Sequence, residues 1–552
     1  MRIDKLWIKE FKNHKNFTID FDEDEMINVI VGRNGTGKSN AMEALVIIFR
    51  DLDLGNDPQF AYEIEYDIYD TRVKVNADPE RIKNGRKDFY HITITPRRKT
   101  ETSEKTLQGE LPLEGIEARP QGHSLSLSAF RAEGQRPYLP RYLFGYYSGP
   151  SNRLEEHFAA HQKLFYDALI RGVEKPLRPL LYARLIHSQF VLLAFFIDRD
   201  DANNAIRDFL REQLRIEGLD SVLFVMREPS WTSKEGDARF WYARGTVQKF
   251  LDKLYSLALA PLRFEQRVEL HFRKNINKEH LYLYLPDQQT LRDLASIYDS
   301  QQDFFKALES TYISDLISEV RIRVKIRNMD GSLTFREMSE GEQQLLMVLG
   351  LLRFTKEDES LFLLDEPDTH LNPNWSIYYL KYINDIVGDQ QTSQVIMSTH
   401  NPLTLAGLTS RQVSIIYRDE ETGQIRSEPA QNDPKGMGVG GILTSDIFGL
   451  RSTLDPATLQ LLDEKRSLSI KTPEEMTSRD RERLADLNDE LENLGFNKTS
   501  SDPLYEPFVD AMTEVEQQEG MQVPVLSREQ QAERKELALK VLQKVKQKKN
   551  SR

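Results

Sequence analysis

A glycine-rich octapeptide near the N-terminus constrains the fold more than any other stretch of this chain. Residues 32–39 read Gly-Arg-Asn-Gly-Thr-Gly-Lys-Ser and follow an apolar run at 26–31. The match to G-x-x-x-x-G-K-S is complete, and it stands in the strand–loop–helix setting that the motif requires. The motif therefore predicts a sheet-and-helix core in which a buried strand leads through the loop into a buried helix.

Each part of this loop has a chemical role toward a nucleoside triphosphate, for which we expect ATP. The glycines let backbone N–H groups curl around the phosphates. Lys38 can reach the terminal phosphates, and the Ser39 hydroxyl can ligate a magnesium ion. The residues expected to contact the phosphates or the magnesium ion are Asn34, Gly35, Thr36, Gly37, Lys38 and Ser39.

The other half of a phosphate site stands far downstream. Ser339 and Gly341 form a Ser-x-Gly turn that opens an apolar helical run, so the turn presents free backbone N–H groups and a hydroxyl to an anion. An apolar strand at 361–364 then ends in Asp365 and Glu366. Two adjacent acids offer one ligand for magnesium and one group that activates water.

A histidine follows the next strand. Residues 395–399 form a short strand-like run, and His400 comes directly after it. A histidine at a strand end that faces the nucleotide can hydrogen-bond the terminal phosphate. A lone histidine is more often structural, but its place after the paired carboxylates favours the functional interpretation.

The composition excludes several classes of protein. The 552 residues include no cysteine, which rules out disulfides, thiolate chemistry and a cysteine-based zinc site and makes the cytoplasm the expected compartment. The net charge of -13 argues against a protein that coats nucleic acid, although it leaves room for a local basic groove. The longest apolar run, at 190–197, is too short to span a bilayer, so we expect no membrane partner.

We expect an ATPase head that is split by an inserted lobe. Residues 1–150 would form the N-terminal part of the head, and 151–325 a mainly helical inserted lobe. Residues 326–430 would complete the head with the Ser-x-Gly turn, the carboxylates and the histidine. Residues 431–552 would form a helical C-terminal region that binds partners.

The chain carries no clear nuclease centre. Asp198, Asp200 and Asp201 follow an apolar run and could suggest a metal-dependent nuclease, but as the end of a helix they need no metal. No strand after His400 ends in Asp-x-Asp. We therefore expect any nuclease activity to come from a partner.

The four motifs together resemble those of ABC-type ATPases. More narrowly, they resemble the overcoming-lysogenization-defect and RecF-like branch, whose signature often reads Leu-Ser-x-Gly-Glu. Further stretches at 146–149, 180–196 and 441–450 are similar to the PtuA ATPases of Septu anti-phage systems, including the retron-associated versions. The fold that this resemblance implies is an α/β, ABC-type P-loop head with a mixed sheet, an inserted helical lobe and a helical C-terminal extension.

The resemblance also implies roles for single residues. It assigns Lys38 and Ser39 to phosphate and magnesium and Asp365 to magnesium. Glu366 would polarise the attacking water, and His400 would sense the terminal phosphate. The usual magnesium-contacting glutamine of the family has no secure counterpart in this sequence.

In that family the ATP is held between two heads, so the resemblance implies a homo-oligomer that is at least a dimer of heads. Ser339 and Gly341 would contact the ATP held by another subunit. Asp368 would lie at the boundary between the subunits.

The resemblance finally implies partners: an HNH nuclease of the PtuB type and, in retrons, a reverse transcriptase with its RNA-linked DNA. The expected function is a regulatory ATPase of a defence complex that controls the nuclease. The alternatives are a RecF-like or Rad50-like repair ATPase that clamps DNA and a stand-alone nuclease of the overcoming-lysogenization-defect type. The missing cysteines remove the zinc hook of the Rad50-like version, and the missing Asp-x-Asp strand disfavours the nuclease.

Overall fold

The computed structural model of this chain folds as two compact units. The larger unit contains 1–404, 411–416 and 425–429, and the smaller unit contains the rest of the chain. The described residues are 1–83, 86–96, 122–132, 135–173, 177–197, 208–231, 235–271, 274–328, 331–354, 359–387, 392–472, 474–496, 505–519, 521 and 526–550.

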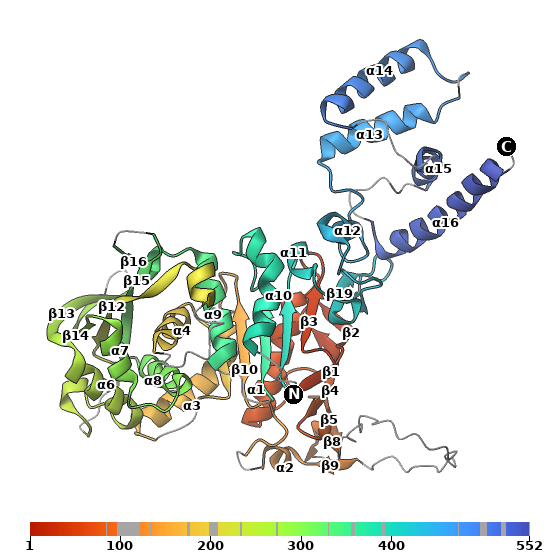
Figure 1. The fold of residues 1–552 in the computed structure, drawn as a ribbon. Helices are drawn as coiled ribbons and strands as arrows, with labels where there is room; N and C mark the ends of the chain where they lie inside the picture. The colour runs from red at the N-terminus through yellow and green to blue at the C-terminus, as the bar shows by residue number, and fades with distance from the viewer. Residues whose placement is uncertain are drawn as a thin grey trace, which may run out of the picture. The chain divides into compact units, whose positions relative to one another are not determined.

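A seven-stranded sheet forms the centre of the larger unit (Figure 1). In sheet order its strands are β11 (Leu180–Tyr182), β10 (Leu143–Tyr147), β17 (Leu361–Asp365), β18 (Gln394–Ser398), β3 (Ile27–Val31), β19 (Val413–Arg418) and β20 (Ile425–Pro429). The pairings from β11 to β19 are all parallel. Parallel strands place their carboxyl ends at one edge, so the segments that follow β3, β17 and β18 meet there.

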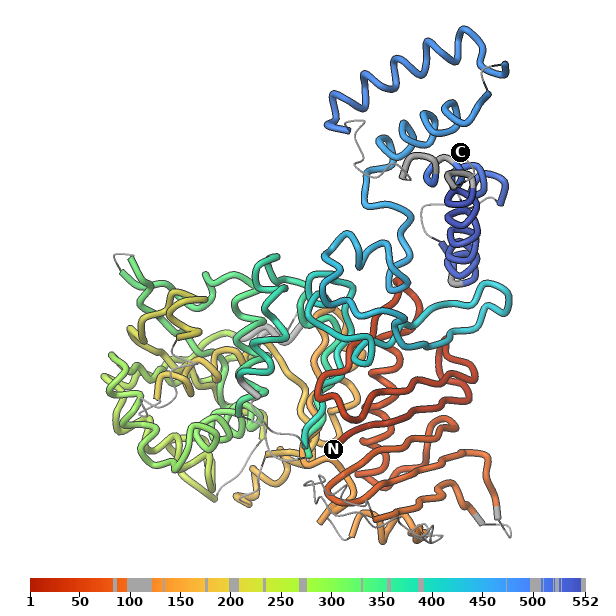
Figure 2. The backbone as a smooth tube through the Cα atoms, turned by 45° about the vertical axis from the view of Figure 1, so that its right-hand side comes forward, coloured from red at the N-terminus to blue at the C-terminus, as the bar shows by residue number. Residues whose placement is uncertain are grey.

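A six-stranded antiparallel sheet covers the other side of the head's first helix, α1 (Lys38–Leu54). Its strands in order are β2 (His14–Asp20), β1 (Arg2–Phe11), β4 (Tyr62–Ile68), β5 (Thr71–Ala77), β8 (Tyr90–Pro96) and β9 (His123–Leu125). Figure 2 shows most of this sheet as stacked red and orange strands. One apolar core joins Phe49 of α1 to Tyr66 of β4 and Leu361 of β17, so α1 is the buried helix that the sequence predicts.

The structure adds a sheet to the lobe that the sequence analysis expects to be mainly helical at 151–325. The chain between β11 and α9 (Glu340–Phe354), called the lobe below, contains a five-stranded antiparallel sheet as well as helices. In sheet order the strands are β13 (Leu259–His271), β14 (Lys274–Leu285), β12 (Ile216–Arg227), β15 (Ile317–Ile326) and β16 (Ser332–Thr334). In β15, apolar and basic residues alternate with the period of two that a half-buried strand requires.

Four helices of the lobe are α4 (Ile186–Phe196), α6 (Gly245–Leu257), α7 (Gln288–Ala295) and α8 (Gln301–Ile313). Of these, α4 packs against α9, the helix that the Ser-x-Gly turn opens. A Cβ on Gly350 of α9 would lie 2.0 Å from Val191, so this glycine lets the two helices approach closely. The rings of Phe195 and Phe354 lie 5.2 Å apart at the same contact. The lobe is therefore packed directly against a functional helix of the head.

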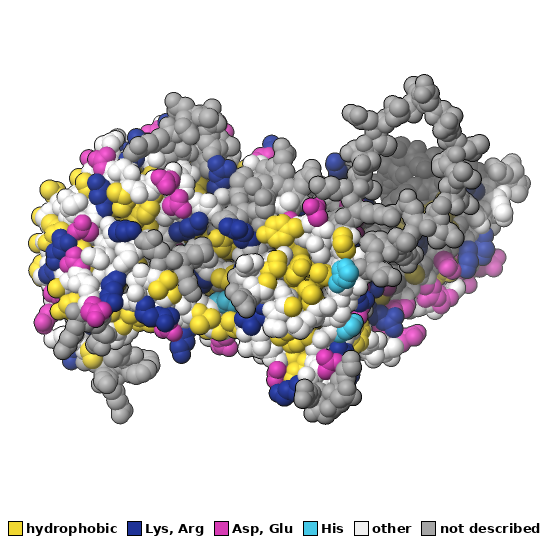
Figure 3. Space-filling model, turned by 90° about the horizontal axis from the view of Figure 1, so that it is seen from below, with side chains coloured by type: hydrophobic (Ala, Val, Ile, Leu, Met, Phe, Trp, Pro, Cys, Tyr) yellow, Lys and Arg dark blue, Asp and Glu magenta, His cyan; other side chains and the backbone are white. Residues whose placement is uncertain are grey.

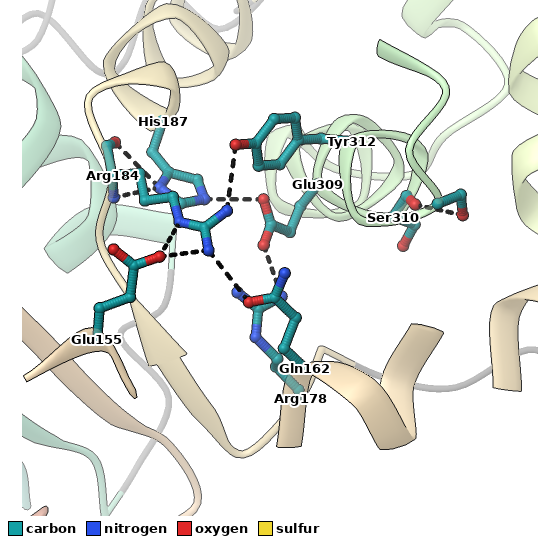
Figure 4. Close-up of polar contacts among 9 residues, drawn as sticks. Glu155, Gln162, Arg178, Arg184, His187, Glu309, Ser310 and Tyr312 are labelled. Atoms are coloured by element: carbon teal, nitrogen blue, oxygen red, sulfur yellow. Dashed lines mark hydrogen bonds and ion pairs between the residues drawn. The ribbon is translucent and has the colours of Figure 1, made fainter. Parts of the chain in front are cut away.

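A buried ionic cluster ties the lobe to the edge of the parallel sheet (Figure 4). Glu309 of α8 is fully buried, and its two oxygens lie 2.6 Å from Arg178 Nη1 and 2.8 Å from His187 Nε2. Burial raises the pKa of Glu309, but the charges and hydrogen bonds of His187 and Arg178 outweigh it and bring that pKa to about 2. Because Arg178 stands just before β11 and His187 on α4, the cluster joins three elements.

The smaller unit is helical where it is described, as the sequence predicts for the C-terminal extension. Its helices are α12 (Gly438–Thr444), α13 (Pro456–Ser469), α14 (Ser478–Asn493), α15 (Tyr505–Gln518) and α16 (Arg528–Asn550). The Arg451 guanidinium is held by Asp463 of α13 at 2.6 and 2.7 Å. Among the described helices of the whole chain, none is both long and apolar enough to cross a membrane.

Candidate nucleotide site

The phosphate loop connects β3 to α1, as the motif predicts. A Cβ on Gly32 would lie 2.2 Å from the Ile416 carbonyl oxygen, so β19 leaves room only for glycine there. Gly37 has a φ of 94°, and a Cβ on it would lie 2.7 Å from Asn13 Oδ1. Both glycines are therefore required by the local backbone, and the loop's N–H groups remain at the carboxyl edge of the sheet.

The ammonium group of Lys38 lies inside this loop. Its side chain is buried, and its Nζ donates to the carbonyls of Gly32 at 2.9 Å and Arg33 at 3.4 Å. Burial lowers the pKa of Lys38, while the nearby Glu366 and Asp365 oppose that shift. In the described part of the chain, no carboxylate lies within 4 Å of Nζ. The ammonium is thus placed close to acids without being neutralised by a direct ion pair.

The paired carboxylates stand at the end of β17 and have different surroundings. Asp365 is buried and accepts a hydrogen bond from Ser398 Oγ of β18. Glu366 has a φ of 54°, which is unusual for a residue other than glycine. Its N–H lies 3.1 Å from the Ser398 carbonyl oxygen, and this contact holds the turn. Asp365 is thus held inside the head, whereas Glu366 is partly exposed.

His400 lies beside Glu366. The distance from Nδ1 of the ring to Oε1 of the carboxylate is 3.3 Å, and the side chains are 45% and 24% exposed. This distance brings the imidazole ring and the carboxylate together at the edge of the sheet. A ring nitrogen of His400 can donate a hydrogen bond to a phosphate bound at this edge. Both side chains keep room for a ligand.

Asp368 is fixed inside the head. Its buried carboxylate accepts hydrogen bonds from Thr399 Oγ1 at 2.7 Å and Thr404 Oγ1 at 2.5 Å. Burial raises the pKa of Asp368, and the two hydroxyls oppose that rise. This arrangement makes Asp368 a positioning residue for the segment that carries His400. Its expected place at a subunit boundary stays a prediction.

The Ser-x-Gly turn is built as a helix cap. Ser339 Oγ accepts from the Glu342 N–H at 3.3 Å, and Glu342 Oε2 accepts from the Ser339 N–H at 2.7 Å. A Cβ on Gly341 would lie 2.4 Å from the His370 carbonyl oxygen, so the glycine allows the loop after β17 to pass. Ser339 is exposed, and no hydrogen bond joins it to Lys38 among the described residues.

Two residues that the sequence analysis missed contact the backbone of the phosphate loop. His14, at the start of β2, is fully buried, with Nε2 3.0 Å from the Gly37 carbonyl oxygen. Asn13 Nδ2 donates to the Gly35 carbonyl at 3.1 Å. Burial lowers the pKa of His14 to about 4, so at neutral pH the ring is uncharged and Nε2–H donates to Gly37. No linear motif marks these two residues, because they lie in the turn between β1 and β2, outside the phosphate loop itself.

Two other histidines, His157 and His161, each contact a different carboxylate. His157 Nε2 lies 3.0 Å from Glu43 and His161 Nε2 lies 2.7 Å from Asp53, two residues of α1. No group of three His, Asp or Glu side chains among the described residues is arranged to hold a metal by itself. Magnesium that binds with substrate needs only one or two protein ligands, which fits Ser39 and Asp365. The aspartates at 198, 200 and 201 lie outside the described residues.

Two family models match the chain. One, described as AAA domain, putative AbiEii toxin, Type IV TA system, covers residues 194–406, and the other, described as AAA ATPase domain, covers residues 1–108. The Septu protein PtuA of Bacillus mycoides (strain KBAB4) is 29% identical over 197 residues, which are 34% of this chain and 27% of that protein. The chain resembles PtuA, and its head is that of a P-loop ATPase.

A second PtuA, from Bacillus thuringiensis, is 26% identical over 180 residues, which are 29% of this chain and 44% of that protein. Protein ea59 of Escherichia phage lambda is 28% identical over 116 residues, 21% of each chain. The match therefore spans less than half of each PtuA.

Among solved structures, the SMC head domain from Thermotoga maritima has 12% identity and a TM-score of 0.30, with 78% of this chain and all of that chain covered. An SmcHead bound to the C-winged helix domain of ScpA gives 12% identity and a TM-score of 0.31, with 78% and 98% covered. TM-scores of this size do not by themselves establish a common fold. The PtuA-like head is assigned to its class by the phosphate loop and the parallel sheet.

Proposed function

We propose that this chain binds ATP with magnesium, hydrolyses it at a site that two heads complete, and thereby controls an associated nuclease in an anti-phage defence complex. The single observation that supports ATP binding and hydrolysis is that Lys38, Asp365 and Glu366 lie close together at one edge of the parallel sheet. Phosphoryl transfer to water needs mainly charge stabilisation and positioning, and these groups can supply both.

The side chains divide this work. Lys38 brings a buried positive charge to the terminal phosphates. Ser39 and Asp365 would hold the magnesium ion, which when bound neutralises charge on the phosphate oxygens. Glu366 is partly exposed and has no direct cationic partner other than His400 among the described residues, so its carboxylate can accept a proton from the attacking water.

Completion of the site by a second head is supported by the exposure of Ser339. The turn presents a hydroxyl and helix N–H groups to the outside of the head, where they can receive the phosphates of a nucleotide bound to another copy. Gly341 is fixed against the loop that follows the carboxylates, so a contact at the turn would reach Glu366 through His370. Assembly and nucleotide state would then depend on each other.

The defence role rests on the similarity to PtuA. It suggests an HNH nuclease of the PtuB type as partner and, in retron-associated versions, a reverse transcriptase with its RNA-linked DNA. The helical smaller unit is the candidate docking region for these partners. The proposed compartment is the cytoplasm.

The variant Glu366→Gln tests the assignment of the water-activating group. We expect it to lower ATP hydrolysis about 100-fold or more, because a general base contributes roughly that much, while ATP binding is retained. Native mass determination with ATP and magnesium should then show the assembled state persisting. Hydrolysis at the parental rate would remove Glu366 from its proposed role.

The control is Glu421→Gln, the same chemical change at an exposed loop position of the smaller unit. It should hydrolyse ATP like the parent.

If the parental complex purified from its own operon contains no nuclease but is an ATP-dependent dimer that captures DNA, the repair-type clamp replaces the defence proposal.

A further inference from the structure

The lobe sheet has one face that no described element covers. Its inner face packs on helices, as the Phe224 ring lies 6.1 Å from Phe250 of α6, which in turn lies 6.5 Å from Phe304 of α8. Figure 1 shows these helices on one side of β12 to β15. The register of the strands defines the opposite, outer face, because side chains alternate along each strand.

One half of the outer face is aromatic and exposed. Phe264 on β13 is 53% exposed, and Tyr284 on β14 is 37% exposed. Between them Tyr282 lies with its ring 5.9 Å from that of Phe264. Leu262, paired with Tyr282, is also half exposed. Exposed rings on neighbouring strands form a platform rather than isolated surface residues.

The other half of the outer face is basic. On β15, Arg321, Arg323 and Lys325 point outward, while the residues between them are buried. Glu319 is shared by Arg321 at 2.8 Å and Arg336 at 2.7 Å, so it cannot neutralise both. Figure 3 views the underside of the lobe, at the left of the picture, where basic and hydrophobic side chains are also intermixed.

Two further carboxylates near this basic strand lie in helix caps. Glu337 accepts from the Thr334 N–H at 2.7 Å, and Asp287 accepts from the Thr290 N–H at 2.7 Å. Beyond Lys325 a cleft of about 710 Å³ continues the basic strip with Arg211 and Arg327, against the single further acid Glu217 among its described lining residues. The local charge is thus positive in a chain whose net charge is -13.

The two halves are close enough to serve one ligand. β12 alone separates the aromatic strand β14 from the basic strand β15, so the rings and the cations stand about 10 Å apart at the usual strand spacing. The hydroxyl of Tyr282 is near enough to Arg321 to act on it electrostatically. Leu223 of β12, which pairs with both Tyr284 and Arg321, provides an apolar floor between them.

We propose that the outer face of the lobe sheet binds single-stranded nucleic acid, with bases stacked on Phe264, Tyr282 and Tyr284 and phosphates bound along β15. A strand with unpaired bases offers flat rings and anionic phosphates side by side, which matches the two halves of the face. Duplex DNA hides the flat faces of its bases and would leave the aromatic half unused. This binding site is separate from the nucleotide site and does not depend on the proposed ATP hydrolysis.

The test uses the full-length protein and labelled oligo-dT, oligo-U and a mixed-sequence duplex of equal length, followed by fluorescence anisotropy at several salt concentrations. We expect tighter binding of oligo-dT, oligo-U or both than of the duplex, and the preferred probe identifies the natural class as DNA or RNA. Equal or tighter binding of the duplex would overturn the proposal.

Two variants address the two halves. The double variant Phe264→Ala/Tyr284→Ala should weaken binding about 10-fold or more at every salt concentration, because stacking is largely independent of salt. Arg323→Glu/Lys325→Glu should weaken binding by a similar factor and lower the salt dependence, because phosphate contacts are lost. The matched controls Tyr69→Ala and Lys9→Glu change exposed residues of the head and should bind like the parent.

Photo-cross-linking of a halogenated oligonucleotide to the parental protein gives a readout that does not depend on variant folding. Cross-links should map to the peptides that contain Phe264, Tyr282 or Tyr284. Cross-links confined to other parts of the chain would overturn the proposal. So would variants that change the native mass of the protein but not its affinity for oligonucleotides, because the face would then be an interface between proteins.

Discussion

Two places in the larger unit bring together a carboxylate, a histidine and a basic side chain, and they differ in how completely these groups satisfy one another. In the lobe, both oxygens of Glu309 are taken by Arg178 and His187 at hydrogen-bond distance, and the carboxylate is fully buried. At the sheet edge, Glu366 faces His400 at 3.3 Å, and Lys38 donates only to carbonyls.

The difference separates a structural cluster from a site that is ready for a ligand. Both oxygens of Glu309 already have partners, so the contribution of this cluster is to hold α8, α4 and β11 together. The sheet edge keeps an ammonium without an ion pair, a partly exposed carboxylate and a ring nitrogen that can still donate. Phosphates and magnesium would complete the second arrangement, whereas nothing is missing from the carboxylate of the first.

The largest effect that distinguishes the two places is on stability. Glu309→Gln should lower the free energy of unfolding of the larger unit by about 3–5 kcal/mol, because it leaves a buried guanidinium without its counter-charge. Glu366→Gln should change the same quantity by less than about 1 kcal/mol, because that carboxylate is partly exposed. Chemical denaturation measures both. A larger loss in Glu366→Gln than in Glu309→Gln would reverse the comparison.

The pH dependence of stability sharpens the same contrast. The pKa of Glu309 is lowered from its ordinary 4.5 to about 2 in the folded protein. Its contribution, about 3 kcal/mol, is therefore complete above pH 4.5 and is lost as the pH falls from there toward 2. The difference in unfolding free energy between the parent and Glu309→Gln should shrink in that window. A difference that stays constant from pH 6 down to the acid transition would contradict this assignment.

A smaller loss of stability is expected for a variant next to Asp368, which positions the segment that carries His400. Thr399→Val removes one of the two hydroxyls that hold Asp368, and it should cost about 1–2 kcal/mol of stability. It should also lower ATP hydrolysis, because His400 follows Thr399 directly. Thr18→Val, on β2 and without a hydroxyl contact to a buried acid, should change stability by less than about 0.5 kcal/mol. Equal losses in the two variants would deny Asp368 its positioning role.

The predictable parts of the fold are those whose function depends on consecutive residues of the sequence. For the phosphate loop at 32–39 and for the strand that ends in Asp365, the local sequence alone indicates both the conformation and the chemistry. The α/β head and the similarity to PtuA are confirmed for this reason. The roles of the single site residues stay predictions, because no comparison tests them.

The parts that were missed depend on contacts between distant segments. His14 reaches Gly37 from the turn between β1 and β2, and the carboxylate of Asp368 binds Thr399 and Thr404, which follow β18. The lobe sheet carries a readable signal in the alternation of β15, but its arginines also suit an exposed helix. Pairing with β12 decides between the two, and that pairing partner lies about a hundred residues away.

The central claim is that one head's phosphate loop works with another head's Ser-x-Gly turn, and mixing two inactive variants tests it most directly. Lys38→Ala removes the phosphate-binding ammonium, while Ser339→Asp keeps a good helix cap but places a negative charge where phosphates would bind. Each variant alone should hydrolyse ATP poorly. We predict that mixing them restores hydrolysis, because a mixed pair contains one site with both residues intact. A mixture that stays as inactive as its components, or a Ser339→Asp variant with parental activity, would contradict the account.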